Sequence, residues 1–239
     1  IIVPRGQSSI VWFTLLAAVG IFVLVRVGGW YQRNIGHHLA RVHARRKAGG
    51  ATVARGKVVA SLVILMALIF SKYFYLVSLT NYYTFYLIDR FHVSVSLSQI
   101  YLFVFLFAVA AGTLMGGPLG DRFGRKYVIW FSILGVAPFS IALPHVGLTA
   151  TILLSILIGV ILASAFSAIL VYAQELIPGK VGLIAGLFFG FAFGISGVAS
   201  AALGKLADHT SIEYVFYLCG FLPLIGLLTG FLPNLERHK

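Results

Sequence analysis

One lysine of this sequence lies deep inside a long apolar stretch, where a charged side chain is costly. Lys72 follows Val58, where the apolar stretch begins, by 14 residues. A membrane helix would therefore carry it about 21 Å from that end, too far for its stem to return the ammonium group to water. Intramembrane charges face a cavity or a partner. We interpret Lys72 as an anion-binding residue; the alternative is a structural pair with a carboxylate outside this sequence.

Tyrosines gather on the same expected helix as Lys72. Tyr75, Tyr82 and Tyr86 share its face at helical spacing, and their hydroxyl groups suit hydrogen bonds to a polar ligand. An aromatic belt at the outer membrane interface explains Tyr82, Tyr83 and Tyr86 equally well. The predicted substrate-binding residues are Lys72, Tyr75, Tyr82 and Asn81, the last of which is also compatible with a helix break.

A second group of charged residues lies in a loop between two apolar stretches. Residues 116–126 read Gly-Gly-Pro-Leu-Gly-Asp-Arg-Phe-Gly-Arg-Lys. The glycines permit a tight reversal of the chain. Asp121 precedes the next stretch, where it can cap a helix or contact the N-terminus of another. Glu175 ends a later stretch within expected reach of Arg125, and the alternative is a solvated surface pair of little energetic weight.

Two weaker motifs suggest enzyme or metal chemistry. Gly194-Ile195-Ser196-Gly197 has the form used by intramembrane serine proteases, which also need a histidine at similar depth on a neighbouring helix. No other apolar stretch clearly holds one. His37, His38 and His43 lie close together, but their spacing fits no familiar ligand set. We expect neither an enzyme active site nor a metal or cofactor.

The composition defines the solvent in which these residues must be positioned. Hydrophobic residues make up 60% of the 239 residues and charged residues 10%, whereas soluble domains carry roughly 25% charged residues. A water-soluble fold could not bury so much apolar surface, so the solvent is lipid. The net charge of +12 does not indicate nucleic acid, because the charges form short runs between apolar stretches. The lone Cys219 excludes a disulfide framework.

Seven apolar stretches are long enough to span a bilayer. Because backbone polar groups in lipid must be paired within the segment, we predict an all-α membrane protein. A polar segment with a basic run and a Gly-Gly pair separates the first span from the others and is predicted to be a linker. The expected parts are residues 1–30, the linker 31–57 and a six-helix domain 58–239. The spans are Ser9–Trp30, Val58–Leu87, Ser98–Gly117, Tyr127–Leu143, Leu148–Tyr172, Val181–Leu203 and Tyr214–Pro233.

The basic residues predict the orientation in the membrane. If the linker is cytoplasmic, 14 of the 18 lysines and arginines lie on that side or at its interface, as the positive-inside rule requires. Arg5, Arg90 and Lys205 then fall outside, and Lys72 lies within the membrane. We therefore expect a multi-pass protein whose C-terminus is cytoplasmic.

The loop at residues 116–126 contains the pattern G-x-x-x-D-R-x-G-R-K and resembles the signature loop of the major facilitator superfamily. Two spans separate the linker from this loop and four follow it, an order similar to helices seven to twelve of that family after helix six and the central loop. The resemblance implies half of that fold, a six-helix domain plus one preceding helix, with the N-terminal half of the same transporter as a missing partner. It also implies conformational gating by Asp121, Arg122, Arg125 and Glu175.

Longer strings resemble bacterial antibiotic exporters of the same superfamily. They imply export of a small anionic phosphonate across the bacterial inner membrane, driven by proton entry. Export or transport of another small solute is the main alternative, and a membrane protein that does not transport is a third. The strings are Phe70–Tyr75, Tyr82–Leu87, Gly124–Trp130, Ser132–Phe139 and Ile161–Glu175.

Small residues recur every fourth position in one apolar stretch, at Gly182, Gly186, Gly190 and Gly194. This spacing lets two helix backbones approach closely. The family resemblance places these glycines against a helix of the missing half, and packing within the present half is the alternative.

Overall fold

The computed structural model describes residues 14–15, 17–30, 55–177 and 179–233, and it divides into two units, residues 1–52 and 53–239. In the first unit an apolar helix covers Ala17–Trp30, so the predicted span Ser9–Trp30 is described only in part. Most of the predicted linker and the histidines His37, His38 and His43 lie outside the described residues. The last three linker residues, Arg55–Lys57, are described and form the start of a helix, which corrects that boundary.

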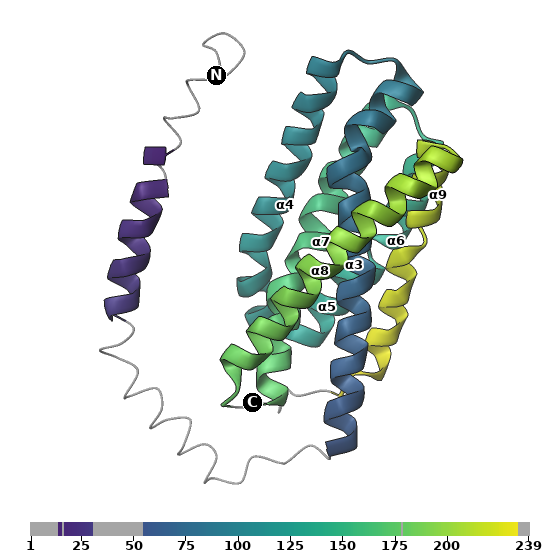
Figure 1. Ribbon diagram of the computed structural model, residues 1–239. Helices are drawn as coiled ribbons and strands as arrows, with labels where there is room; N and C mark the ends of the chain where they lie inside the picture. Colours follow the sequence, from purple (N-terminus) through teal and green to yellow (C-terminus); the bar gives the residue numbers. More distant parts are fainter. Residues whose placement is uncertain (1–13, 16, 31–54, 178, 234–239) are drawn as a thin grey trace. The chain divides into compact units, whose positions relative to one another are not determined.

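The second unit is a bundle of helices (Figure 1), which confirms the all-α prediction for the described part of the chain. Six of its segments are long and apolar enough to cross a membrane. The elements are α3 (Arg55–Phe91), α4 (Val95–Phe123), α5 (Arg125–Leu134), α6 (Ala137–Ala142), η2 (Leu143–His145), α7 (Leu148–Leu176), α8 (Val181–His209), α9 (Ile212–Cys219) and η3 (Leu222–Phe231).

Two of the six segments are interrupted, where the sequence predicts single helices. The third consists of α5, α6 and the short η2, with Pro138 at the start of α6 and Pro144 within η2. The sixth changes from α-helix to 3-10 helix beyond Gly220, with Pro223 at the start of η3. Proline has no backbone N–H and its ring crowds the preceding turn, so these are the positions where regular helix is hardest to continue.

Helix α3 packs against α4, α7, α8, α9 and η3. Its first half enters one buried cluster through Leu65, Leu68 and Ile69. Its second half enters another, which includes Tyr75 and Tyr83. The helix has 37 residues, a length of about 55 Å. Lys72 lies between the two clusters, near the middle of this length.

Helices α4 and α7 touch through their backbones at two glycines. A Cβ atom added to Gly112 would lie 2.2 Å from the carbonyl oxygen of Val160, and one added to Gly116 would lie 2.3 Å from that of Ser164. Gly117 has no neighbour within 4 Å of such an atom. The seam between α4 and α7 therefore depends on side chains no larger than hydrogen.

We expect Gly116→Ala to destabilise the protein by about 1–3 kcal/mol, because the added methyl group overlaps a helix backbone that cannot move aside alone. Gly117→Ala is the matched control and should be neutral or slightly stabilising, since alanine favours helix and the space is open. Thermal unfolding of the two variants in detergent measures this. Equal melting temperatures would show that the seam is not closely packed.

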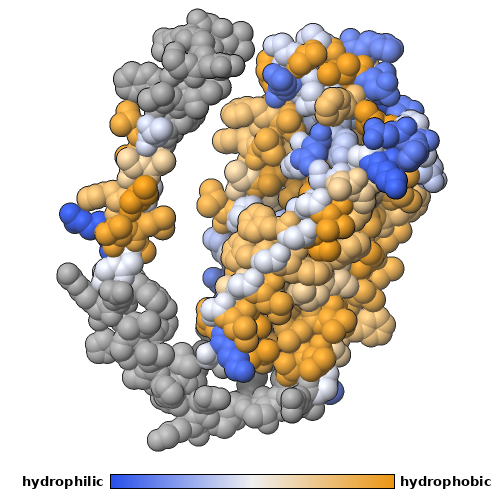
Figure 2. All heavy atoms as spheres, viewed as in Figure 1, coloured by the Kyte–Doolittle hydropathy of each residue, from blue (hydrophilic) through white to orange (hydrophobic). Residues whose placement is uncertain are grey.

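Apolar side chains cover most of the visible face of the second unit, and hydrophilic residues gather toward its ends (Figure 2). Large exposed examples are Phe103, Leu114, Phe193 and Phe231. Such a surface suits lipid or further protein rather than water. Among the six spans, α8 and α4 are the least buried within the unit.

Candidate functional site

Lys72 is buried, with 2% of its surface exposed, and it contacts α7 rather than the outside of the bundle. Its Nζ atom lies 3.4 Å from the carbonyl oxygen of Ala163. The same atom lies 5.3 Å from the ring centroid of Tyr73 and 5.1 Å from that of Phe166. Both rings are close enough for attraction between the cation and the π-electrons. No carboxylate pairs with Lys72 in the described part of the chain, where the ion pairs involve Arg90 and Arg125.

The ammonium group of Lys72 uses only part of its capacity to donate hydrogen bonds. An ammonium group can donate three hydrogen bonds, and the single bond to Ala163 is long. A buried charge with so few partners is costly. The arrangement therefore suits an anion that supplies the missing acceptors.

Tyr73 and Phe166 are neighbours of Lys72 that the helical-face argument missed. Their rings meet edge to face with centroids 5.7 Å apart. Tyr73 is half-buried. Tyr73 follows Lys72 directly and so points about 100° away around α3, which is why periodicity excluded it. Its ring still reaches the ammonium group, because the lysine side chain is long and α7 brings Phe166 to the same place.

The other predicted binding residues lie apart from Lys72. Tyr75 is fully buried in the second cluster, with Phe216 and Cys219, and its hydroxyl has no hydrogen-bond partner there. Asn81 donates to the Ser200 hydroxyl over 2.9 Å, and Tyr82 donates to the Ser200 carbonyl over 2.7 Å. These two residues tie α3 to α8. The alternative that Asn81 lies at a helix break is wrong, because α3 continues through it. Substrate binding by Tyr75, Asn81 and Tyr82 stays a prediction.

The aromatic-belt interpretation is wrong for Tyr83 and Tyr86, which are fully buried in the bundle. The Tyr83 hydroxyl lies 3.0 Å from that of Ser155 on α7. Tyr86 stacks on Phe216 of α9 with ring centroids 4.3 Å apart. Both rings therefore join α3 to neighbouring helices instead of facing the membrane interface.

The predicted charge cluster comes together where α4 turns into α5. Arg125 pairs with Asp121 of α4, with 3.3 Å between Nη2 and Oδ1, and also with Glu175 at the end of α7. One guanidinium group therefore joins α4, α5 and α7. The side chain of Asp121 is 74% exposed and that of Glu175 44%. Exposed pairs contribute at most about 1 kcal/mol each, so the cluster is not a major source of stability.

Two details of the loop differ from the prediction. Asp121 lies in the last turn of α4 and does not cap α5; the N-cap is Gly124. Gly124 alone makes the reversal, with φ of +92°, a conformation that favours glycine. Gly116, Gly117 and Gly120 are helical, which corrects the expectation that they form the turn.

Two further basic residues lie beside this turn. The Arg122 guanidinium lies 5.4 Å from the ring centroid of Phe123 and is not part of the three ion pairs described here. Lys126 donates to the carbonyl oxygens of Gly230 and Leu232, so it holds the end of η3 against α5. At the opposite end of the bundle, Arg90 pairs with Glu213 and joins α3 to α9.

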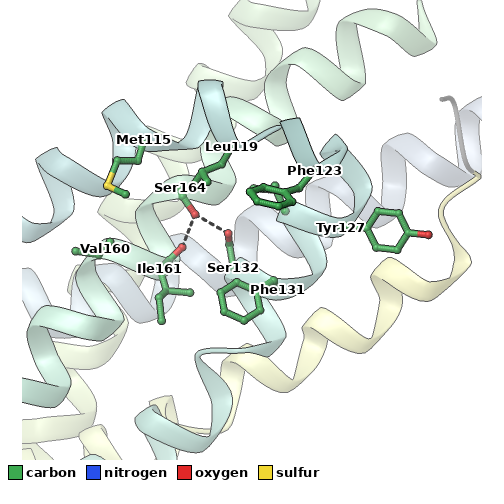
Figure 3. Close-up of a pocket in the computed structure, with 10 residues that line it drawn as sticks. Met115, Leu119, Phe123, Tyr127, Phe131, Ser132, Val160, Ile161 and Ser164 are labelled. Atoms are coloured by element: carbon green, nitrogen blue, oxygen red, sulfur yellow. Dashed lines mark hydrogen bonds between the residues drawn. The ribbon is translucent and has the colours of Figure 1, made fainter. Parts of the chain in front are cut away.

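A pocket of about 380 Å³ lies between α4, α5 and α7 (Figure 3). Its walls are mainly apolar and aromatic, including Met115, Phe123 and Phe131. Its polar part is a pair of serine hydroxyls, Ser132 and Ser164, whose oxygens are 2.6 Å apart. No charged side chain lines this pocket, so it is a poor match for an anion, and Lys72 remains the better candidate.

The glycine row of α8 has no partner within the second unit. A Cβ atom added to Gly182, Gly186, Gly190 or Gly194 would meet nothing within 4 Å. Figure 2 shows a pale stripe running along α8 between apolar residues. We call these four glycines the glycine stripe. The alternative that it packs within this half is wrong for the described residues.

The structure gives the serine protease alternative no support. The Ser196 hydroxyl donates to the carbonyl oxygen of Ala192 in its own helix, over 2.7 Å. The histidines of the described part, His92, His145 and His209, lie at helix ends or just beyond them. The same part of the chain contains no group of three histidine, cysteine or acidic residues placed to hold a metal.

Comparison with known proteins identifies relatives along the whole chain. The family described as "Major Facilitator Superfamily" matches residues 6–201 and 66–239. The fosmidomycin resistance protein of Escherichia coli (strain K12) is 54% identical over 100% of this chain. The MFS-type transporter YfnC of Bacillus subtilis (strain 168) is 42% identical over 100% of it. The chain spans 58% of the length of each of these two proteins.

A more distant match has narrower coverage. Multidrug resistance protein 3 of Bacillus subtilis (strain 168) is 31% identical over 56% of this chain and 27% of its own length. No solved structure matches significantly.

Proposed function

This chain belongs to the major facilitator superfamily and forms half of its fold, and we propose that it is the C-terminal half of a proton-driven exporter of small anions. The observation that carries the proposal is Lys72, a buried cation with one long hydrogen bond and no carboxylate partner among the described residues. A dianion such as a phosphonate would supply both the charge and the acceptors that this site lacks.

The similarity to a fosmidomycin resistance protein supports the proposed substrate class. We propose that fosmidomycin-like phosphonates are exported, with Lys72 holding the anionic group. The alternative substrate is another small solute handled by the same superfamily, as the match to a multidrug resistance protein also allows.

Transport measurements on the intact protein test this proposal. Inside-out vesicles with an acidified lumen should accumulate labelled fosmidomycin, because protons leaving the lumen drive the drug inward. Vesicles without the transporter are the control, and accumulation should stop when the proton gradient is dissipated. Accumulation that persists without the gradient would contradict proton coupling. Uptake of other solutes without uptake of any phosphonate would favour the alternative substrate.

We propose that the chain lies in a bacterial inner membrane with its C-terminus in the cytoplasm. The basic residues Lys57, Arg122, Arg125, Lys126 and Lys180 gather at one end of the second unit, which supports that end as the cytoplasmic one. Cysteine labelling of Lys57→Cys and Lys205→Cys from the outside should modify position 205 alone. Labelling of position 57 instead would reverse the orientation.

The missing partner is proposed to be an N-terminal half that closes the transport path against this one. The glycine stripe of α8 is an open surface of suitable shape for a close helix contact.

We propose that Asp121, Arg122, Arg125 and Glu175 govern which side of the membrane the binding site faces. Arg125 joins three helices at one end of the bundle through Asp121 and Glu175. A change of access must rearrange helix ends, so a bond among them favours one conformation over the other.

In the intact transporter, Asp121→Asn should reduce transport up to about fivefold while phosphonate affinity stays within about threefold of the wild type, since the lost pair biases the conformations by at most about 1 kcal/mol. The exposed carboxylate contributes little to stability, so the amount of folded protein should be normal. Vesicle transport and equilibrium binding measure the two quantities. Loss of binding together with an unchanged conformational balance would contradict the gating role.

A further inference from the structure

Four aromatic side chains form a continuous row that starts at Lys72 and ends on the surface of the second unit. Tyr73 of α3 meets Phe166 of α7 at 5.7 Å between ring centroids. Phe166 meets Phe189 of α8 at 5.0 Å, and Phe189 stacks on Phe193 at 6.3 Å. We call Tyr73, Phe166, Phe189 and Phe193 the aromatic row.

Burial decreases along the row. Tyr73 and Phe166 are half-buried around the ammonium group. Phe189 is 41% exposed and Phe193 is 69% exposed. If the charged group of a ligand reaches Lys72, the uncharged body of that ligand would therefore contact Phe166 and Phe189.

The row also runs beside the glycine stripe. Phe189 and Phe193 directly precede Gly190 and Gly194, and so lie about 100° from them around α8. If the other half packs against the glycine stripe, the row borders that contact. The side chains of the row are apolar, apart from the Tyr73 hydroxyl.

We propose that the aromatic row is an apolar subsite that selects anions carrying an aromatic or other apolar body. The anionic group binds at Lys72, the body lies against Phe166 and Phe189, and the Tyr73 hydroxyl donates to the anion or its neighbouring atoms. This inference rests on the proposed anion-binding role of Lys72. The expected gain follows from apolar burial and offset ring contacts, which together favour an aryl body by at least about tenfold over a methyl group.

Two ligands of equal charge separate this subsite from the anion site. Methylphosphonate and phenylphosphonate carry the same anionic group and differ in the body. Calorimetric titration of the purified intact transporter should give phenylphosphonate an affinity at least about tenfold higher. Phe166→Leu and Phe189→Leu should each reduce this preference to about threefold or less, through weaker binding of the phenyl compound alone.

Phe103→Leu is the matched control, because Phe103 is 67% exposed on α4 and lies outside the row. It should leave the preference unchanged. Phe189 is itself exposed, so Phe189→Leu should fold normally even if Phe166→Leu does not. An unchanged preference in the Phe189→Leu variant, or no preference in the wild type, would overturn the subsite.

Lys72→Gln distinguishes failure of this inference from failure of the proposed function. In one outcome, Lys72→Gln binds neither phosphonate, while Phe166→Leu and Phe189→Leu keep the wild-type preference for the phenyl compound. That outcome keeps the anion site and overturns the aromatic subsite. In the opposite outcome, Lys72→Gln binds both phosphonates as the wild type does, while Phe189→Leu still loses the preference for the phenyl compound. That outcome overturns the anion site and keeps the subsite.

Discussion

Replacing Lys72 by alanine in the intact transporter should weaken phosphonate binding by at least about 30-fold, because truncating one member of a buried charge pair costs about 2–5 kcal/mol. Lys72 is 2% exposed, and its ammonium group has a single hydrogen bond of 3.4 Å within the described chain. A bound phosphonate would lose its cation and gain no replacement, so resistance of cells to the drug should fall with the affinity.

Lys72→Arg should retain part of the binding. The charge survives, but a planar guanidinium group presents its donors in a different geometry. Its larger head must also fit between Tyr73 and Phe166, whose rings both lie about 5 Å from the lysine Nζ atom. We therefore expect an affinity between those of the wild type and the alanine variant, measured by titration with the same phosphonate.

The rival hypothesis makes Lys72 a structural partner of a buried carboxylate in the other half. Removal of Lys72 would then leave that carboxylate unpaired, and the protein should misfold or become scarce. Folded protein in the membrane, measured beside phosphonate affinity, separates the two hypotheses. Normal abundance with weak binding favours the anion site, and low abundance favours the structural pair. Normal abundance with unchanged affinity would contradict both.

The sequence was sufficient to predict the parts of the structure that depend on one helix or one loop. Hydropathy located the six spans of the second unit, because about 20 apolar residues are needed to cross lipid. The meeting of Arg125 with Asp121 and Glu175 was also predicted correctly. Asp121 and Arg125 are close in sequence, and Glu175 ends a span on the same side, so few arrangements can keep the three apart.

Contacts between helices could not be derived in the same way. The angle of a residue around its own helix gives the direction of its Cβ atom, but it does not show which neighbour fills the space beyond. Tyr75 was expected beside Lys72 and instead packs near Phe216, while Tyr73 reaches the lysine because α7 places Phe166 there. The helix interruptions near Gly135 and Gly220 were missed for a different reason, since hydropathy carries no information about backbone geometry.

Enlarging the glycine stripe should stop transport without disturbing the fold of the second unit. Gly190 lies on an open face of α8, where an added Cβ atom meets nothing within 4 Å. If another helix packs there in the intact transporter, Gly190→Leu would force the two backbones apart. We expect a loss of transport of at least about fivefold, because overpacking a close contact costs about 1–3 kcal/mol or more.

A graded series shows whether close packing is the cause. Gly190→Ala should reduce transport moderately and Gly190→Leu severely, since the clash grows with side-chain size. Leu153→Phe is the matched control: it enlarges a side chain on α7 that is 58% exposed and lies outside the stripe, and it should transport normally.

The amount of folded protein and its transport must be measured together. Gly190→Leu is expected to leave the second unit folded but to impair transport by the assembled protein. The open space around Gly190 predicts that Gly190→Leu leaves the second unit folded, so the variant should be present in the membrane in normal amounts. Transport equal to the wild type would show that no helix approaches this face during the cycle. A low amount of protein with normal transport per molecule would place the stripe in assembly rather than in the change of access, because a contact needed only for assembly costs protein and not turnover.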